Sequence, residues 1–290
     1  YVFPGIPDSL NTWFVIIAVV TVLYMISALR GLDRGIQVLS RANIVLAGVL
    51  LLAMLVIGPT TFILNILTTT TGDYFSSLLT MSLDSNPFEG YEWTKKWTLF
   101  FWATWISWSP FVGLFVASIS RGRTIREFVL GALLVPSLLT FVWFAVFGGA
   151  AFELEIHQGA DIAAATADHV STGLFNVLKH YPLSWLMTGI ALLLLAVFFV
   201  TSADSSTLVL AMLTSQGDLR PSAYRKVVWG VIQSTAAAIL LAAGGLHALR
   251  KMSISAALPF TIVMLLLCYS LWKGVSYEYE YERGGGEEGG

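Results

Sequence analysis

Residues Trp97–Phe128 read WTLFFWATWISWSPFVGLFVASISRGRTIREF. This stretch is an apolar segment of membrane-spanning length that contains four tryptophans and runs directly into three arginines. Tryptophan in membrane proteins gathers at the two water interfaces, so tryptophans spread through the depth of a span indicate a specific task. Aromatic faces bind organic cations. The stretch therefore predicts a transmembrane helix that is also a candidate cation-binding element.

The composition of the whole chain is that of a membrane protein. Of its 290 residues, 56% are hydrophobic and 12% are charged, and the mean hydropathy is +0.76. Crossing a hydrocarbon core takes about 20 apolar residues, and runs of this kind recur at 12–29, 44–67, 97–118, 128–150, 185–213, 227–245 and 256–272. Helices satisfy their own backbone hydrogen bonds in lipid, and the runs lack the two-residue alternation of barrel strands. We predict an all-α polytopic membrane protein.

The basic residues indicate an orientation. If the first span ends inside, alternation places 30–43, 119–127, 214–226 and the C-terminal tail in the cytoplasm. These segments carry most of the 16 Lys and Arg residues, namely Arg30, Arg34, Arg41, Arg121, Arg123, Arg126, Arg220, Arg225, Lys226, Lys273 and Arg283. The opposite side has only Lys95, Lys96, Lys179, Arg250 and Lys251. By the positive-inside rule we expect a multi-pass cell-membrane protein with a cytoplasmic C-terminus. The net charge of −2 by itself says nothing about partners, and we expect no nucleic-acid partner.

Three regions outside the spans have their own character. The chain opens with Tyr1 just before a span, so we expect it to be a piece of a longer protein. Residues 73–83 place apolar side chains at near-helical spacing, which predicts a short interfacial helix; an irregular loop is the alternative. The tail, residues 273–290, has low complexity and is predicted to be disordered. The single cysteine, Cys268, excludes an intrachain disulfide.

Helical geometry gathers the aromatic residues of 97–118. At about 100° per residue, Trp97, Phe101, Trp105 and Trp108 fall on one stripe. Pro110 lacks an N–H and clashes with the Ile106 carbonyl, so we expect a kink and a freed carbonyl beside Trp105 and Trp108. Such features are typical of transporter sites. Packing and interfacial anchoring are the alternative, and they are the favoured interpretation for Trp97 and for Trp102 on the flank of the stripe.

A second constellation follows Phe198 in span 185–213 and reads TSADSST, residues 201–207. Hydroxyls and unwound carbonyls are hard oxygen ligands that suit Na⁺, and broken helices present them at the bilayer midplane. The span is long enough that we expect tilt or a break. Equally, the hydroxyls could bond back to the preceding turn or to a neighbouring helix. Asp204 is the only carboxylate well inside a span, which makes it a candidate for gating or for a buried hydrogen bond.

Residues Ser120–Glu127, SRGRTIRE, allow two interpretations. Arg121, Arg123 and Arg126 could simply mark a cytoplasmic loop, or they could form a gate that pairs with carboxylates elsewhere. The four histidines are scattered without ligand spacing, and nucleophile and phosphate-loop motifs are absent from the sequence. We therefore expect no enzymatic activity and no cofactor, with Na⁺ as the coupling ion.

Together these motifs resemble the betaine/choline/carnitine transporter family. The match comprises W-x-x-W-x-x-W-S-P-F-V-G from Trp102 to Gly113, followed by SRGRTIREF. It continues with VWF-x-x-FGG from Val142 to Gly149 and FF-x-TS-x-DS from Phe198 to Ser205. The resemblance implies an inverted-repeat fold of twelve spans like that of amino-acid transporters. In that plan residues 1–272 are the transmembrane domain, spans six to twelve, with 97–272 as the second five-helix repeat and the first five spans missing.

The resemblance also implies roles for individual residues. Substrate would be bound by tryptophans, with Trp105 as a wall of a quaternary-ammonium box and Trp108 and Trp102 along the pathway. Sodium would be bound by the Phe198 carbonyl, Thr201 and Ser202, while Phe111 would border a second proposed sodium site. Val112 stands where sodium-independent antiporters carry Met, which favours ion-coupled uptake. Thr104 stands where members usually have the first of a tryptophan pair, and this departure affects the inner pathway.

We therefore expect a secondary transporter of quaternary-ammonium compatible solutes, above all glycine betaine, coupled to Na⁺. Alternating access would move span 97–118 relative to span 185–213. Choline or carnitine transport, H⁺-coupled or by exchange, is the alternative. A channel would need a polar pore lining, and an enzyme would need a second acid near Asp204. The expected partners are the onium substrate, the lipid bilayer and, by resemblance, two further copies of the chain in a homotrimer joined through 73–83.

Overall fold

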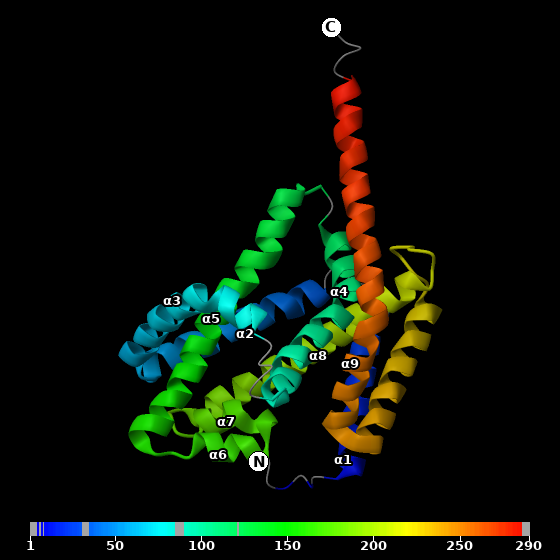
Figure 1. Cartoon of the computed structure of the whole chain (residues 1–290). Coiled ribbons are helices and arrows are strands. Elements are labelled where there is room, and N and C mark those ends of the chain that lie inside the picture. The colour runs from blue at the N-terminus through cyan, green and yellow to red at the C-terminus, as the bar shows by residue number, and fades with distance from the viewer. Residues whose placement is uncertain are drawn as a thin grey trace. The chain divides into compact units, whose positions relative to one another are not determined.

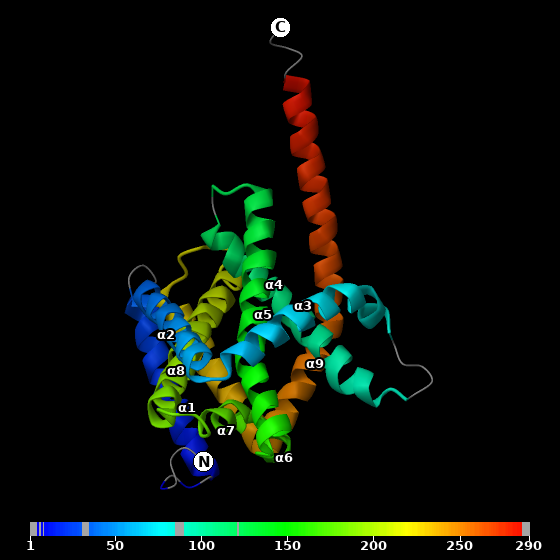
Figure 2. The ribbon, with the colours of Figure 1, turned by 90° about the vertical axis from the view of Figure 1, so that its left-hand side faces the viewer.

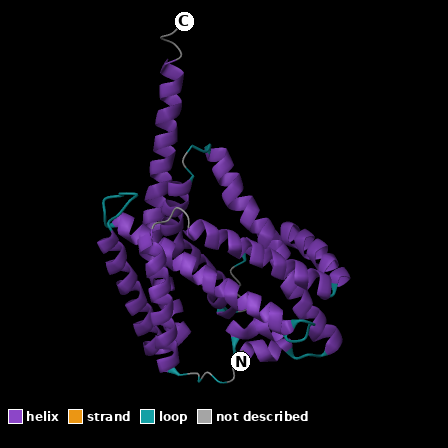
Figure 3. Ribbon diagram, turned by 180° about the vertical axis from the view of Figure 1, so that it is seen from behind, coloured by secondary structure: helices purple, strands orange, loops and turns teal. Residues whose placement is uncertain are grey.

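The computed structural model describes Gly5, Pro7 and residues 9–30, 35–84, 90–120 and 122–285. The regular elements among these residues are all helical, as Figure 3 shows. Seven helical segments of the described chain are long and apolar enough to cross a membrane: Leu10–Leu29, Leu39–Ile57, Trp97–Ser118, Ile125–Gln158, Ser184–Leu213, Ala223–Gly245 and Arg250–Glu278. The predicted class, an all-α polytopic membrane protein, is confirmed.

The helices follow one another along the chain with few long connections (Figure 1). In order they are α1 (Leu10–Arg30), α2 (Gly35–Ile57), α3 (Thr60–Leu83), η1 (Thr94–Leu99), α4 (Phe100–Ile119), α5 (Ile125–Gln158), α6 (Ile162–Asp168), η2 (Val170–Thr172), α7 (Gly173–Leu178), α8 (Ser184–Leu213) and α9 (Ala223–Gly285). The chain divides into two compact units. The first contains residues 1–84 and 122–234, and the second contains 85–121 and 235–290.

The hydrophobic core of the first unit lies where α2, α3, α5 and α8 meet. Its fully buried side chains include Leu50, Met54, Ile63, Val146, Leu154, Leu178 and Met187. Gly149 of α5 faces Ile63 of α3, and a Cβ added there would lie 3.6 Å from the Ile63 side chain, at ordinary contact distance. The short helices α6 and α7 pack against the end of α5 and bury Ile162 and Val177 in the same core.

The predicted span 44–67 is wrong, because the chain breaks in its middle. Helix α2 ends at Ile57, and α3 begins at Thr60 after Gly58-Pro59. Proline disfavours the helical conformation of the residue before it. The first turn of α3 is tied back to α2, since the Thr60 hydroxyl donates to the Leu55 carbonyl at 2.6 Å. The apolar run therefore continues through two helices, of which only α2 has the length and hydropathy of a span.

The start of α5 is fixed by its own sequence. The backbone N–H of Glu127 donates to the Thr124 hydroxyl at 3.3 Å, and the backbone N–H of Thr124 donates to the Glu127 carboxylate at 3.1 Å. This reciprocal capping box satisfies two of the amide groups that a helix start leaves without partners. It places the beginning of α5 directly after the arginine-containing segment.

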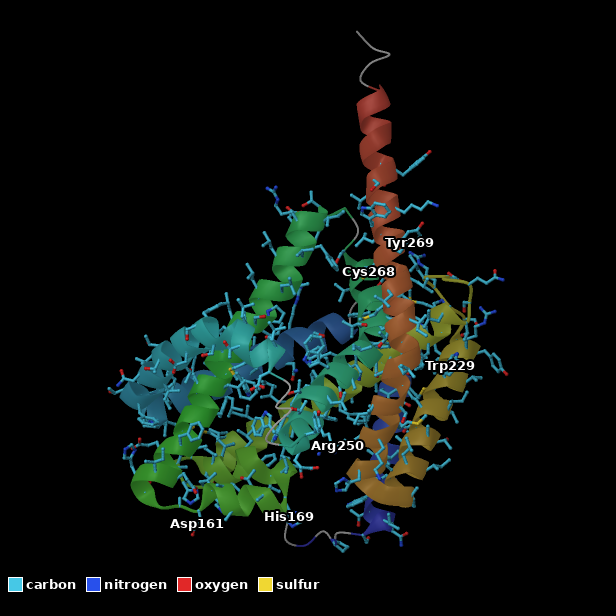
Figure 4. All side chains as sticks on the ribbon, in the orientation of Figure 1. Asp161, His169, Trp229, Arg250, Cys268 and Tyr269 are labelled. Atoms are coloured by element: carbon cyan, nitrogen blue, oxygen red, sulfur yellow. The ribbon has the colours of Figure 1, made fainter. Side chains whose placement is uncertain are left out.

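The second unit joins η1 and α4 to the later part of α9. The Ser107 hydroxyl donates to the Ser253 carbonyl at 2.7 Å. The guanidinium of Arg250, labelled in Figure 4, lies 5.2 Å from the ring centre of Phe100. A cation over an aromatic face is attracted by the ring quadrupole. Both contacts hold α4 against the same stretch of α9.

Helix α9 is two helices joined at Gly244 and Gly245. Gly245 has φ 59° and ψ −143°, a conformation that favours glycine. After this junction the helix runs on as one long rod to Gly285, which Figure 2 shows in orange to red. The structure thus differs from the expectation of a disordered tail over 273–290: helix continues through Gly285, and residues 286–290 lie outside the described chain. Extending an existing helix requires no new nucleation, which is the costly step in helix formation.

Candidate functional site

The aromatic stripe of the predicted cation-binding helix lies along η1 and α4. Trp97 and Phe101 stack with ring centres 6.2 Å apart and planes within 9° of parallel. Trp105 is 68% exposed, Trp102 62% and Trp108 51%. The indoles that the sequence singled out for substrate therefore have faces available, whereas Trp97 is engaged in stacking, as its packing interpretation predicted.

The expected freed carbonyl beside Pro110 is already occupied. Pro110 lies within the continuous helix α4, and the Ser109 hydroxyl donates to the Ile106 carbonyl at 2.9 Å. Ser109 also contacts the sulfur of Met264 on α9. The hydroxyl next to the proline thus replaces the missing backbone donor at this carbonyl. Phe111, one residue further on, is half-buried.

The hydroxyl-rich part of α8 is helical throughout. Helix α8 runs unbroken over Ser184–Leu213, so the expected break is absent and the backbone does not unwind there. The Thr201 hydroxyl lies 3.0 Å from both the Val197 and the Phe198 carbonyl oxygens, in the pattern of a hydroxyl that bonds back to its own turn. Ser202 and Phe198 are exposed. These oxygens form a cluster of hard donors on one exposed side of α8, a donor type that suits Na⁺.

Asp204 lies on the buried side of the same helix. Its residue is 1% exposed, and the Ser27 hydroxyl of α1 donates to the carboxylate oxygen Oδ2 at 2.6 Å. The ammonium group of Lys226 on α9 donates to the carbonyl of Ala28, the next residue along α1, at 3.2 Å. Asp204 therefore joins α8 to α1 through a buried hydrogen bond, and its gating role stays a prediction.

Gln233 of α9 is a site residue that the sequence reasoning missed. Its amide oxygen accepts from the Ser206 hydroxyl at 2.7 Å. Its amide nitrogen lies 2.8 Å from the Thr207 hydroxyl and 3.2 Å from the Ala203 carbonyl. The available signal was a carboxamide within an apolar span, a residue type that forms hydrogen bonds between membrane helices.

Three further hydrogen bonds join α9 to its neighbours. Tyr24 of α1 donates its hydroxyl to the Gly230 carbonyl at 2.6 Å, and the Thr21 and Ser234 hydroxyls lie 2.7 Å apart. At the end of α8, the indole N–H of Trp229, labelled in Figure 4, donates to the Thr214 hydroxyl at 2.9 Å. Helices α1, α8 and the first part of α9 are thus cross-linked by polar side chains in a largely apolar setting.

The arginines proposed for a gate are placed only in part. Arg121 lies outside the described residues. Arg123 and Arg126 are exposed. Arg123 precedes the capping box that begins α5, and Arg126 lies within it, between Thr124 and Glu127. The gating interpretation of these arginines stays a prediction.

The predicted interfacial helix 73–83 is the second half of the longer helix α3. Tyr74 contacts Phe141 of α5 with ring centres 5.1 Å apart. Beyond this contact the apolar side chains are exposed: Phe75, Leu79, Met81 and Leu83. The helical part of the prediction is confirmed, but its start is wrong, because the helix begins directly after Pro59.

Comparison with known proteins adds an independent line of evidence. The family described as BCCT, betaine/carnitine/choline family transporter, matches residues 1–280. The glycine betaine transporter OpuD of Bacillus subtilis (strain 168) is 50% identical over 280 residues, which are 96% of this chain and 54% of that protein. The ectoine/hydroxyectoine transporter of Virgibacillus pantothenticus is 40% identical over 271 residues, 93% of this chain and 54% of that protein.

The high-affinity choline transport protein of Escherichia coli (strain K12) is 41% identical over 282 residues, which are 96% of this chain and 42% of that protein. The chain therefore spans about half the length of the curated relatives it matches. The relatives named for a substrate carry betaine, ectoine or choline in their names, and the match extends over nearly all of the chain.

Proposed function

The chain belongs to the betaine/carnitine/choline transporter family, and we propose that it serves Na⁺-driven uptake of glycine betaine. Family membership makes it a multi-pass membrane transporter rather than an enzyme. The choice of substrate and of coupling ion is the proposal, and it has separate support from α4 and from α8.

The observation that carries the substrate proposal is the exposure of Trp105 and Trp108 inside an apolar span. An indole face attracts a methylated ammonium group with about 0.5–2 kcal/mol. One face is too weak for a useful affinity, so a binding site needs several faces around the cation. We propose that Trp105 supplies one wall, with Trp108 and Trp102 lining the path to it.

Glycine betaine is favoured over choline by the degree of similarity. One relative named for glycine betaine is 50% identical and another, a probable glycine betaine transporter, is 38% identical, while the relative named for choline is 41% identical. Both substrates carry a trimethylammonium group, so the same aromatic walls suit either one. Choline uptake by the same helices is therefore the second candidate, and the carboxylate of betaine is what separates the two.

Coupling to Na⁺ is proposed from the oxygens of α8. The Thr201 hydroxyl and the Phe198 carbonyl lie 3.0 Å apart, and Ser202 follows directly. Neutral oxygens of this type take up Na⁺ in transporters. A small rotation of the Thr201 hydroxyl would free one lone pair of the Phe198 carbonyl, and both oxygens could then face one ion. We also propose that Phe111 of α4 borders a second sodium site, and this part of the proposal rests on the sequence motif alone.

The orientation and assembly are part of the same proposal. The distribution of Lys and Arg supports a cytoplasmic C-terminus. The exposed apolar side chains of α3, residues 75–83, support an assembly in which copies of the protein meet through this helix. A homotrimer is the proposed form.

Uptake of radiolabelled betaine tests the substrate and ion proposals together. The full gene product is expressed in a bacterial strain that lacks betaine and choline uptake, with Na⁺ or K⁺ as the only cation. We expect uptake in Na⁺ and none above background in K⁺. An excess of unlabelled betaine should compete better than an equal excess of choline.

A tryptophan variant tests the aromatic wall. Trp105→Ala should raise the KM for betaine about 2- to 30-fold, the loss expected for one cation–π face. Trp272→Ala on α9 is the matched control, because Trp272 is also 68% exposed; its KM should stay within twofold of wild type. Equal KM for wild type and Trp105→Ala would overturn the role of α4, and equal uptake in Na⁺ and K⁺ would overturn the coupling.

A further inference from the structure

The carboxamide of Gln233 on α9 is fully engaged with a single turn of α8. The amide oxygen accepts from Ser206 at 2.7 Å, and the amide nitrogen has partners in Thr207 at 2.8 Å and the Ala203 carbonyl at 3.2 Å. A primary amide has two N–H donors. Both donors and the oxygen are therefore directed at residues 203–207.

The same turn is bonded within itself. The Ala203 carbonyl accepts from the Ser206 and Thr207 hydroxyls, each at 2.8 Å. Thr207 is fully buried, so a partner lost there cannot be replaced easily by water. Gln233 thus completes a closed set of hydrogen bonds rather than adding one contact to an exposed surface.

This turn begins one residue after Ser202. Asp204, in the same turn, is held by Ser27 of α1 at 2.6 Å. Neighbouring helices therefore fix the turn from two directions, and the helix immediately before it carries the Thr201 hydroxyl and the Phe198 carbonyl. Because α8 is continuous here, a rotation of the 203–207 turn would carry Thr201 and Ser202 with it.

We infer that Gln233 is a positioning residue for the Na⁺ ligands of α8, acting through the 203–207 turn without touching the ion. The inference rests on the proposed Na⁺ coupling. Ligand oxygens bind an ion well only when neighbouring contacts hold them in place. Loss of the carboxamide should therefore weaken Na⁺ binding and leave the aromatic substrate walls of α4 unaltered.

The test compares Gln233→Met, which keeps the length of the side chain but removes the amide, with Ser234→Ala. Ser234 is the next residue on α9 and bonds Thr21 of α1 rather than α8, so its variant reports the general cost of loosening α9. Betaine uptake is measured at varied Na⁺ and at varied betaine with saturating Na⁺. Na⁺-dependent thermal stabilisation of the purified full gene product gives a second readout that needs no transport.

For Gln233→Met we expect the half-saturating Na⁺ concentration to rise about fivefold or more in both assays. A fivefold rise corresponds to the loss of about one neutral hydrogen bond. The KM for betaine at saturating Na⁺ should stay within twofold, and Ser234→Ala should leave the Na⁺ dependence unchanged. Gln233→Glu, which keeps the acceptor for Ser206, should fall between wild type and Gln233→Met.

Distinct results would overturn the inference. Unchanged Na⁺ dependence in Gln233→Met, or an equal shift in Ser234→Ala, would make Gln233 a structural residue only, with the proposed coupling intact. Failure of both Gln233 variants to reach the membrane while Ser234→Ala does so would mark a folding role and have the same consequence. A wild-type protein whose uptake and thermal stability ignore Na⁺ would overturn the proposed function and this inference together.

Discussion

Breaking the bond between Ser27 and Asp204 should lower the stability of the folded protein by a measurable coupling energy. The hydroxyl of Ser27 donates to the carboxylate at 2.6 Å, and Asp204 is 1% exposed. Hydrogen bonds to charged groups contribute about 1.5–3 kcal/mol in soluble proteins. Bonds between membrane helices average about 0.6 kcal/mol and reach about 1.7. The short distance and deep burial place this pair near the upper membrane value, about 1.5 kcal/mol.

A double-mutant cycle measures this energy. Ser27→Ala, Asp204→Ala and the double variant of the full gene product are unfolded by denaturing detergent titrated into mild detergent, and the free energy of unfolding is read from each titration. The non-additivity isolates the pair from the separate effects of each substitution. Ser137→Ala combined with Asp204→Ala is the control, because Ser137 is exposed on α5 and bonds only back to Leu133 of its own helix.

The reasoning would be refuted by a coupling within about 0.3 kcal/mol of zero, the usual error of additivity. A Ser137 cycle with a coupling as large as the Ser27 cycle would refute it as well. In either case the α1–α8 contact would be a product of packing, and the carboxylate would be free for the gating role that the sequence left open.

Two further predictions concern the helix junctions. Gly58→Ala should destabilise the protein by about 1–3 kcal/mol, because the new Cβ would lie 2.5 Å from the backbone carbonyl of Met54, which cannot move aside. The midpoint of thermal unfolding measures this loss. Gly48→Ala is the control, because Gly48 has open space around it. Burial, together with the nearby Glu153 charge, raises the pKa of Tyr181 to about 12 from 10.0, so its contribution to stability is full below pH 10 and is lost as the pH rises towards 12. Tyr181→Phe should therefore flatten the fall in unfolding midpoint between pH 10 and 11, and an unchanged pH profile would contradict this.

Hydropathy was sufficient to locate the membrane helices, because the apolar length that a bilayer demands is a property of consecutive residues. Hydropathy failed to show where one membrane helix ends, because a single dipeptide determines that position. The run 44–67 is uniformly apolar, yet Gly58-Pro59 divides it into α2 and α3. The tail shows the opposite error, because low complexity described the composition of 273–285 but not its continuity with a long helix.

The candidate site was predictable to the level of residue type and helix face. The tryptophan stripe of α4 follows from spacing on a helix, whereas the choice of Phe198, Thr201 and Ser202 on α8 came from the resemblance to the family. The partners of those residues follow from neither. Two examples are the bond from Ser109 to the Ile106 carbonyl and the bonds from Gln233 to the Ala203–Thr207 turn. These contacts depend on side-chain rotamers and on which helices are neighbours, and a single sequence specifies neither directly. Tilt or a break of α8 was expected from the length of the span, but the helix is continuous and its hydroxyls bond to carbonyls of their own helix.

Helix α8 shows how one element can serve stability and transport at once. Its buried positions Val200, Asp204, Thr207, Leu208 and Ala211 recur at helical spacing and face the other helices of the first unit. The exposed positions Phe198, Phe199 and Ser202 lie on the other side. The first side is held by Ser27 and Gln233, so the second can present oxygens with little freedom to rotate. Two or three oxygens on one helix cannot surround an ion, so any Na⁺ bound there must gain ligands from other elements of the transporter. An ion that bridges a fixed helix to such elements stabilises whichever conformation brings them together, and this is the property that coupling requires.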